Sequence, residues 1–136
     1  MHLPAITATY LAVLALLYAA LGLRVAMLRR RKRAVFGDAD NAELRAAIRG
    51  HANFSEYVPI IVLMVALLEA SGSSALTVHL LMAALLLSRL LHPIGMHARP
   101  RTLQFNVGRV AGIVITIAVL VASALLILSR ISLTLF

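Results

Sequence analysis

Long uncharged stretches separated by polar turns dominate the hydrophobic pattern of this chain. Residues 3–23 and 110–128 are predominantly apolar and carry no charge, and each can form a helix that crosses a hydrocarbon core of about 30 Å. Residues 57–68 and 75–88 are shorter uncharged runs, about 18 and 21 Å long as helices, so charged neighbours must lie within the membrane if these helices cross it. The pattern predicts four transmembrane helices, at roughly 3–28, 42–70, 75–95 and 102–131.

The connections between these runs are short, which is typical of antiparallel neighbours in an up-and-down bundle. Residues 70–74 read Ala-Ser-Gly-Ser-Ser and predict a turn, and the His-Pro-Ile-Gly stretch at 92–95 begins the break before the fourth helix. The first loop, from residue 29 to about 41, is longer, and Asp40 or Asn41 at its end is expected to cap the second helix. The predicted fold is an all-α, four-helix, up-and-down membrane bundle that forms a single transmembrane domain over residues 1–136.

Composition supports the membrane assignment and excludes several chemistries. The chain is 62% hydrophobic and only 13% charged, which leaves too little polar surface for a soluble domain. Its first apolar run continues into a basic stretch, so we expect a retained helix and not a cleaved signal peptide. Cysteine is absent, which rules out disulfides, thiolate metal sites and a cysteine nucleophile. The histidines do not have a spacing typical of metal ligands, so we expect no metal site.

Basic residues predict the orientation. They cluster at 29–33, at Arg45 and Arg49, and around the third loop, whereas the turn at 70–74 has none. By the positive-inside rule, loops one and three face the cytoplasm and both termini face outward, as in a protein of the bacterial inner membrane. The net charge of +8 also raises the question of nucleic acid. A basic run that touches a membrane helix is usually a topology signal and a contact with anionic lipid, so membrane lipids are the expected partner and nucleic acid is not.

Ionisable residues in the two short helices are the main functional signal. Glu56 and Arg89 both lie roughly 20 Å from the outer ends of their helices, at a depth where an unpaired charge costs at least about 2.5 kcal/mol. One interpretation is an ion pair that simply holds the two helices together. The other is a polar site, because Arg49 and Asn53 precede Glu56 at helical spacing and so share its face.

A second helix contributes to the same predicted site. His92 and Met96 follow Arg89 at positions i+3 and i+7. Pro59 and Pro93 each remove one backbone hydrogen bond, so both helices are expected to be locally broken beside this face. Together these features predict a polar cavity near the cytoplasmic side.

The segment from Arg49 to Pro59, Arg-Gly-His-Ala-Asn-Phe-Ser-Glu-Tyr-Val-Pro, follows the pattern R-x-x-x-N-x-x-E-Y-x-P. This pattern resembles the signature of the MAPEG family, the membrane-associated proteins in eicosanoid and glutathione metabolism. The chain is similar to microsomal glutathione transferases and leukotriene C4 synthase, and most similar to the bacterial branch. The resemblance covers nearly the whole chain, including the basic end of the first helix.

The resemblance implies a homotrimer that binds glutathione in a cleft between subunits, with the thiol directed toward a lipid-accessible groove. The expected glutathione contacts, carried over from the family, are Arg49, Asn53, Glu56, Tyr57, Arg89 and His92. An arginine that stabilises the thiolate would be the catalytic residue, with Arg101 as first choice and Arg30 after it. Gly108 and Gly112 form a small-xxx-small pair that is expected to let the fourth helix pack closely and to contribute to trimer formation.

The implied function is a glutathione transferase or peroxidase that acts on hydrophobic electrophiles or lipid hydroperoxides, with glutathione as co-substrate. Two departures from the family's enzymes leave an alternative open. His92 and Met96 stand where the leukotriene and prostaglandin members have tyrosines, and Phe105 lacks a hydroxyl that some members have. The alternative is a MAPEG-fold protein that binds glutathione or a lipid without turnover. A proton-coupled multidrug transporter of this size is disfavoured, because the first helix holds no acidic residue.

Overall fold

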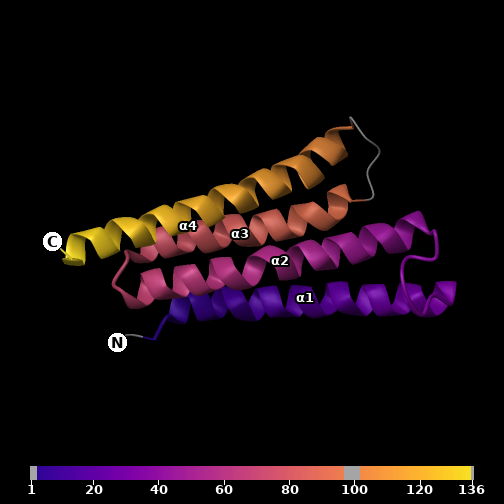
Figure 1. Ribbon diagram of the computed structural model, residues 1–136, viewed down its shortest axis with the longest axis horizontal. Helices are drawn as coiled ribbons and strands as arrows, with labels where there is room; N and C mark the ends of the chain where they lie inside the picture. Colours follow the sequence, from indigo (N-terminus) through magenta and orange to yellow (C-terminus); the bar gives the residue numbers. More distant parts are fainter. Residues whose placement is uncertain (1–2, 97–101, 136) are drawn as a thin grey trace.

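The computed structural model of the chain describes residues 3–96 and 102–135, and in this part of the chain all regular structure is helical (Figure 1). The helices are α1 (Ala5–Lys32), α2 (Ala42–Ala70), α3 (Ala75–Gly95) and α4 (Ala111–Leu135), and a short π-helical segment, η1 (Phe105–Val110), leads into α4. Each of the four α-helical rods is long and apolar enough to cross a membrane. The predicted all-α four-helix bundle is confirmed.

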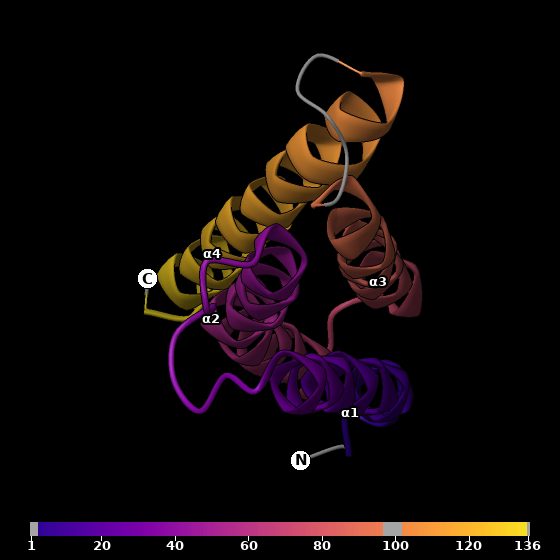
Figure 2. The same cartoon turned by 90° about the vertical axis from the view of Figure 1, so that its right-hand side faces the viewer.

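The helices run alternately up and down. The start of α1, the end of α4 and the α2–α3 turn lie at one end of the bundle, and the α1–α2 connection lies at the other (Figure 1). Helices α2 and α3 form the centre, because each contacts the other and both contact α1 and α4. Helices α1 and α4 lie on opposite sides of this central pair (Figure 2).

Local side-chain and backbone bonds set the helix ends. The Oδ1 atom of Asn41 accepts a hydrogen bond from the Leu44 amide at 3.0 Å, so Asn41 is the cap of α2. Ser74 caps α3 in the same way, with its Oγ accepting from the amide of Thr77 at 3.2 Å. Helix α1 ends where Arg33 adopts a left-handed conformation, with φ of 52°.

The core is a row of aliphatic side chains on the facing sides of the helices, and lipid-facing side chains cover the outside. Its buried members come from all four helices; they include Leu14, Ile61, Val65, Val78, Met82, Leu85 and Val119. Large apolar side chains such as Leu16, Leu63 and Leu125 are more than half exposed. This surface is stable only with hydrocarbon as its solvent.

An acidic side chain joins the end of α2 to the start of α1. The carboxylate of Glu69 accepts bonds from the amides of Ile6 and Thr7, at 2.9 and 2.8 Å, and from the Thr7 hydroxyl at 2.6 Å. The first amides of a helix have no partner within the helix, and the negative charge also complements the helix dipole. Glu69 therefore caps α1 from a different helix.

Glycine allows α3 and the start of the fourth span to touch backbone to backbone. A Cβ atom built on Gly108 would lie 2.5 Å from the Cα of Gly95, and one built on Gly112 would lie 3.3 Å from the Cα of His92. The expected close packing of the fourth helix through Gly108 and Gly112 is confirmed. The expectation that this pair contributes to trimer formation is wrong, because α3 of the same protomer covers it.

Both prolines lie inside continuous helices. Helix α2 continues past Pro59 to Ala70, and α3 continues past Pro93 to Gly95. The expectation of broken helices is therefore wrong. Each proline removes one amide donor, and the neighbouring turns hold the helical path.

Candidate functional site

A buried arginine joins three helices at the centre of the bundle. The side chain of Arg89 on α3 is 1% exposed. Its Nη1 donates to Oδ1 of Asn53 on α2 at 2.6 Å and to the Asn53 carbonyl oxygen at 3.4 Å. Its Nη2 donates to the hydroxyl of Thr116 on α4, and its Nε donates to Ser88 Oγ at 3.2 Å. We call Asn53, Ser88, Arg89 and Thr116 the arginine cluster.

The predicted ion pair between Glu56 and Arg89 is wrong. The hydrogen bonds of Arg89 go to neutral oxygens of Asn53, Ser88 and Thr116, and Glu56 is exposed on the outside of α2. The two residues lie at similar depth, but they face different directions. Three residues turn a helix by about 300°, so Glu56 is displaced by about 60° from Asn53, the residue that meets Arg89.

The predicted residues of α2 therefore divide between an inner and an outer face. Asn53 is buried in the arginine cluster and Tyr57 is half-buried against the core. Arg49 and Glu56 are both exposed on this membrane-spanning helix; Glu56 lies at hydrocarbon depth, whereas Arg49 lies near the end of the span. An exposed charge at membrane depth costs several kcal/mol unless protein, a polar ligand or water covers it.

A shallow basic cavity lies at the end of the bundle where α1 ends and α2 begins. It has a volume of about 240 Å³ and is lined by Ala42, Arg45, Ala46, Arg49, Met96 and Arg109. It brings together Arg49 and Met96, two residues that the sequence placed on the predicted polar face. The guanidinium of Arg109 also lies 5.5 Å from the ring centre of Phe105, which is close enough for a cation–π contact.

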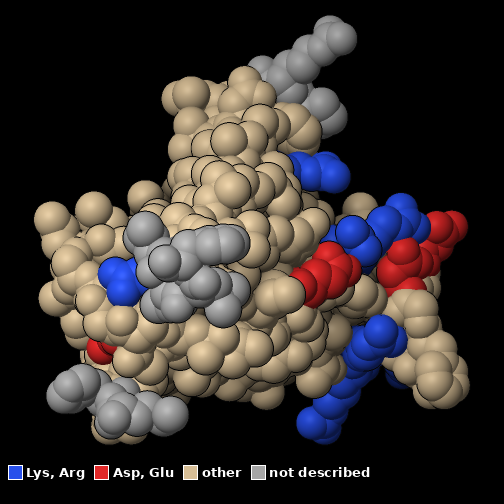
Figure 3. Space-filling view, turned by 60° about the vertical axis from the view of Figure 1, so that its left-hand side comes forward, with Lys and Arg blue, Asp and Glu red and all other residues tan. Residues whose placement is uncertain are grey.

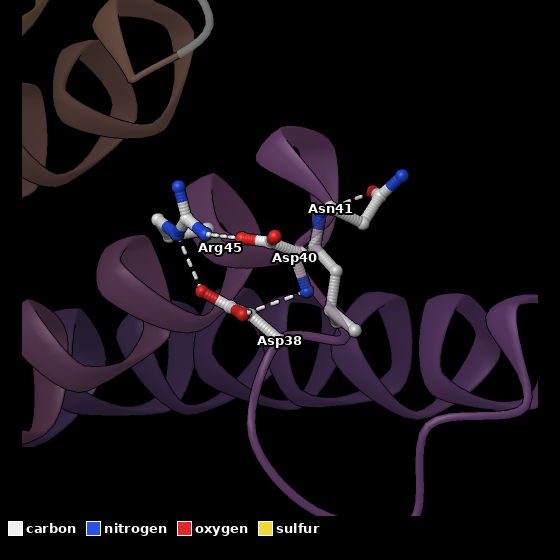
Figure 4. Close-up of polar contacts among 5 residues, drawn as sticks. Asp38, Asp40, Asn41 and Arg45 are labelled. Carbon is white, nitrogen blue, oxygen red and sulfur yellow. Dashed lines mark hydrogen bonds and ion pairs between the residues drawn. The ribbon is translucent and has the colours of Figure 1, made fainter.

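Two aspartates of loop one, which we define as residues 33–41, neutralise one of these arginines. Arg45 pairs with Asp38 and, at 3.0 Å, with Asp40 (Figure 4). The adjacent guanidinium holds the pKa of Asp38 below its usual value of 3.8. Asp38 and Asp40 pair with Arg45 and leave the other two arginines of the cavity, Arg49 and Arg109, available to an anionic ligand.

The remaining predicted residues lie apart from this cavity. His92 is 6% exposed and packs against Gly112 on α4, and its Nδ1 has no hydrogen-bond partner among the described residues. Arg30 is exposed at the end of α1. Arg101, the first candidate for the catalytic residue, lies outside the described residues. No group of three or more His, Cys, Asp or Glu side chains within residues 3–96 and 102–135 is placed to hold a metal ion.

An apolar groove of about 540 Å³ runs between α1 and α2. Leu11, Leu14, Val58 and Val62 are among the residues that line it. At its inner end the Tyr18 hydroxyl lies 3.3 Å from Ser55 Oγ, and the Tyr18 ring stacks on His51 with a centroid distance of 4.5 Å. The groove can accept an apolar chain beside the polar face of α2.

Sequence reasoning missed three residues that shape this region. Thr116 and Ser88 were counted only as parts of apolar helices, and Arg109 was used only to predict orientation. A signal was present for Thr116, because it is a polar residue in the middle of the most apolar helix.

Charged side chains gather mainly at one side of the space-filling view, and most of the remaining visible surface is uncharged (Figure 3). The fold and this surface define an integral membrane protein with four membrane-spanning helices. The chain belongs to the MAPEG family, whose pattern it matches over residues 7–129.

Among curated proteins, the chain is similar to the inner membrane protein YecN of Escherichia coli K12. The two are 36% identical over 94 residues, which cover 69% of this chain and 72% of YecN. YecN of Escherichia coli O6:H1 matches with the same identity and coverage. No solved structure is significantly similar to the chain.

Proposed function

We propose that the protein binds glutathione and uses it as a transferase or peroxidase on hydrophobic electrophiles or lipid hydroperoxides. The observation that carries this proposal is the outer face of α2, where Arg49 and Glu56 are exposed within a membrane-spanning helix. Membership of the MAPEG family, in which glutathione binding is common, supports the same ligand.

The polar groups complement glutathione, a tripeptide with two carboxylates and one ammonium group. Arg49 and Arg109 offer guanidinium groups to the carboxylates, and Glu56 offers an acceptor to the ammonium. The oxygen of the Asn53 amide already accepts from Arg89. Its NH₂ group is the part of the amide that can donate to the ligand.

A homotrimer would cover the exposed charges. The subunit contacts that we propose are the outer face of α2 and the apolar groove between α1 and α2, whereas the glycine face of α4 is already occupied by α3. In the proposed assembly, glutathione lies between a protomer's α2 and its neighbour. Arg49, Glu56 and Tyr57 contact it directly, whereas Arg89 acts through Asn53 and His92 borders the site from α3.

The proposed chemistry begins with ionisation of the glutathione thiol. A nearby guanidinium lowers a thiol pKa, and Arg101 or Arg30 is proposed to supply it. In transfer, the thiolate forms a carbon–sulfur bond as the leaving group departs with its electron pair. In peroxide reduction, two glutathione molecules and one hydroperoxide give glutathione disulfide, an alcohol and water. The apolar substrate would approach from the bilayer.

Glutathione binding by purified protein in detergent tests the proposal, with isothermal titration calorimetry as the measurement. Glu56→Gln and Arg49→Gln should each weaken binding about tenfold or more, because a charged hydrogen bond contributes about 1.5–3 kcal/mol. Glu43→Gln and Lys32→Gln are matched controls, since both residues are exposed and lie outside the cavity. Equal binding by all four variants would place the site elsewhere.

Turnover separates the enzyme from the binding-only alternative. The wild-type complex should show thiolate absorbance in the ultraviolet and should conjugate 1-chloro-2,4-dinitrobenzene or reduce a fatty-acid hydroperoxide. Arg101→Ala and Arg30→Ala identify the arginine that stabilises the thiolate. Binding without thiolate or turnover would favour a protein that binds glutathione or a lipid without reaction. Native mass spectrometry in mild detergent tests the trimer.

The proposed location is a bacterial inner membrane, as the name of the relative YecN indicates for that protein. The basic end of the bundle, which holds loop one, faces the cytoplasm in this proposal, and both termini face outward.

A further inference from the structure

Loop one exposes two large apolar side chains directly after a run of cations. Val35 is 79% exposed and Phe36 is 88% exposed, among the highest values for large apolar residues in the described chain. Arg31, Lys32 and Arg33, which precede them, are also exposed. Exposing such large apolar side chains to water costs free energy. We therefore expect Val35 and Phe36 to contact lipid or another protein.

The buried residue Ala34 fixes the position of Val35 and Phe36 next to the bundle. Between the cations and Val35, Ala34 is 8% exposed and packs with Leu28, Leu44 and Ala47. The Ala34 amide donates to the carbonyl oxygen of Arg29 at 3.0 Å. Loop one therefore turns back along the bundle after α1 ends, and its course outside the helices is visible in Figure 2. Because Ala34 packs against Leu28, the exposed Val35 and Phe36 that follow it lie close to the level of Leu28.

That level matches the headgroup region of a bilayer. The rise from Ala5 to Leu28 is about 35 Å at 1.5 Å per residue. A membrane has a hydrocarbon core of about 30 Å and a total thickness of about 40–45 Å with its headgroups. If Ala5 lies near one edge of the core, Leu28 lies just beyond the other edge, among the headgroups.

We infer that residues 31–36 form a docking element for anionic phospholipid. Val35 and Phe36 insert between the upper parts of the acyl chains, and the side chains of Arg31, Lys32 and Arg33 contact the headgroup phosphates. Guanidinium and ammonium groups bind phosphate well, and apolar side chains beside them add hydrophobic burial.

Charge favours lipid over a second copy of the chain as the occupant. The aspartates nearest to these cations in the sequence, Asp38 and Asp40, are both engaged by Arg45. In a symmetric assembly, the same end of each neighbour would present the same basic residues, so subunits would repel one another there. Anionic headgroups supply the missing negative charge.

Tryptophan fluorescence tests the docking, because the natural chain contains no tryptophan. Phe36→Trp gives a single probe at the proposed insertion point, and Val35→Trp is a second probe if the first variant folds poorly. Glu43→Trp is the matched control, at an exposed position in the first turn of α2. Each variant is reconstituted into nanodiscs of phosphatidylcholine, with or without phosphatidylglycerol, whose acyl chains are brominated to quench nearby tryptophan.

Docking predicts that the emission of Phe36→Trp is more blue-shifted and more strongly quenched than that of Glu43→Trp, which lies at a similar level of the bundle but outside residues 31–36. Quenching should increase with the phosphatidylglycerol fraction. In the background of Arg31→Gln and Lys32→Gln, several-fold more phosphatidylglycerol should be needed, because each basic residue near an anionic surface contributes about fivefold to affinity.

Three results would overturn the inference. Emission from Phe36→Trp that is no more blue-shifted or quenched than that of the control would show that residues 31–36 do not insert. Blue-shifted emission that brominated lipid does not quench would show that protein, such as a second copy, covers the loop. Quenching that is the same with and without phosphatidylglycerol would show that the negative charge of the headgroup does not contribute to docking. Glutathione binding does not enter any of these measurements, so they stand apart from the proposed function.

Discussion

Replacing Thr116 by valine removes one hydroxyl from the arginine cluster and keeps the shape of the side chain. In the native protein this hydroxyl accepts a bond from Arg89 Nη2 and donates to the carbonyl oxygen of Gly112 at 2.7 Å. Thr116 is fully buried, so water is not expected to replace the lost bond at low cost. Arg89 would keep its bonds to Asn53 and Ser88 with one N–H group unpaired.

The expected loss of stability is about 2 kcal/mol. Interhelical hydrogen bonds between neutral groups in membranes average about 0.6 kcal/mol, because the separated helices find other partners. A bond from a charged donor contributes more, about 1.5–3 kcal/mol, and a buried group left unpaired adds a similar penalty. The charged-donor value is the relevant one here, since Arg89 is 1% exposed and donates to the neutral oxygens of Asn53, Ser88 and Thr116.

Reversible unfolding in mixed micelles, with increasing SDS and helix content followed by circular dichroism, measures this loss. Ser123→Ala is the matched control, because Ser123 is also fully buried on α4 but its Oγ has no hydrogen-bond partner among the described residues. That variant should be neutral or slightly stabilised. Thr116→Ser keeps the hydroxyl and should lose less than Thr116→Val. Equal stability of Thr116→Val and Ser123→Ala would refute the assignment of Thr116 to the arginine cluster.

Three further predictions follow from contacts elsewhere in the bundle. Glu69→Gln should cost about 1–3 kcal/mol in the same SDS assay, because it removes the charge from three bonds at the start of α1. Gly108→Ala should fail to form a stable bundle, whereas Gly50→Ala, with no atom within 4 Å of its new Cβ, should be stabilised by up to about 1 kcal/mol. The pairing of Asp38 with Arg45 lowers the Asp38 pKa, so its contribution to stability should be complete above pH 3.8 and should disappear as acidification protonates Asp38, seen as faster hydrogen exchange in loop one.

The pattern of apolar runs, together with the capping and turn residues between them, was enough to predict the helices of this protein. An expected second helix at 42–70 corresponds to α2 (Ala42–Ala70), because Asn41 is a strong cap and Gly72, with φ of 83°, lies in the turn after it. The first helix was expected to end near 28 and continues to Lys32, since arginine and lysine are good helix formers and charge alone does not end a helix.

The direction in which a side chain points around its helix axis was harder to predict than its depth in the membrane. Glu56 and Arg89 lie at similar depth, which suggested an ion pair, but nothing in the spacing of one helix states how far its neighbour is rotated. The acceptors that Arg89 uses instead, Asn53 and Thr116, are on two other helices and are neutral. Only the packing of α2, α3 and α4 brings them together.

The arginine cluster also links the outer face of α2 to the interior of the bundle. The Asn53 amide is held by Arg89, and Arg89 is held in turn by Thr116. A ligand that accepts a bond from the NH₂ group of Asn53 would be bound by an amide whose orientation depends on α4. Thermodynamic linkage is reciprocal. If the contact between α2 and α4 strengthens binding of such a ligand, the ligand stabilises that contact by the same free energy. In this proposal the buried charge of Arg89, costly in a membrane, is tolerated because it fixes the orientation of the Asn53 amide, three residues before Glu56 on α2.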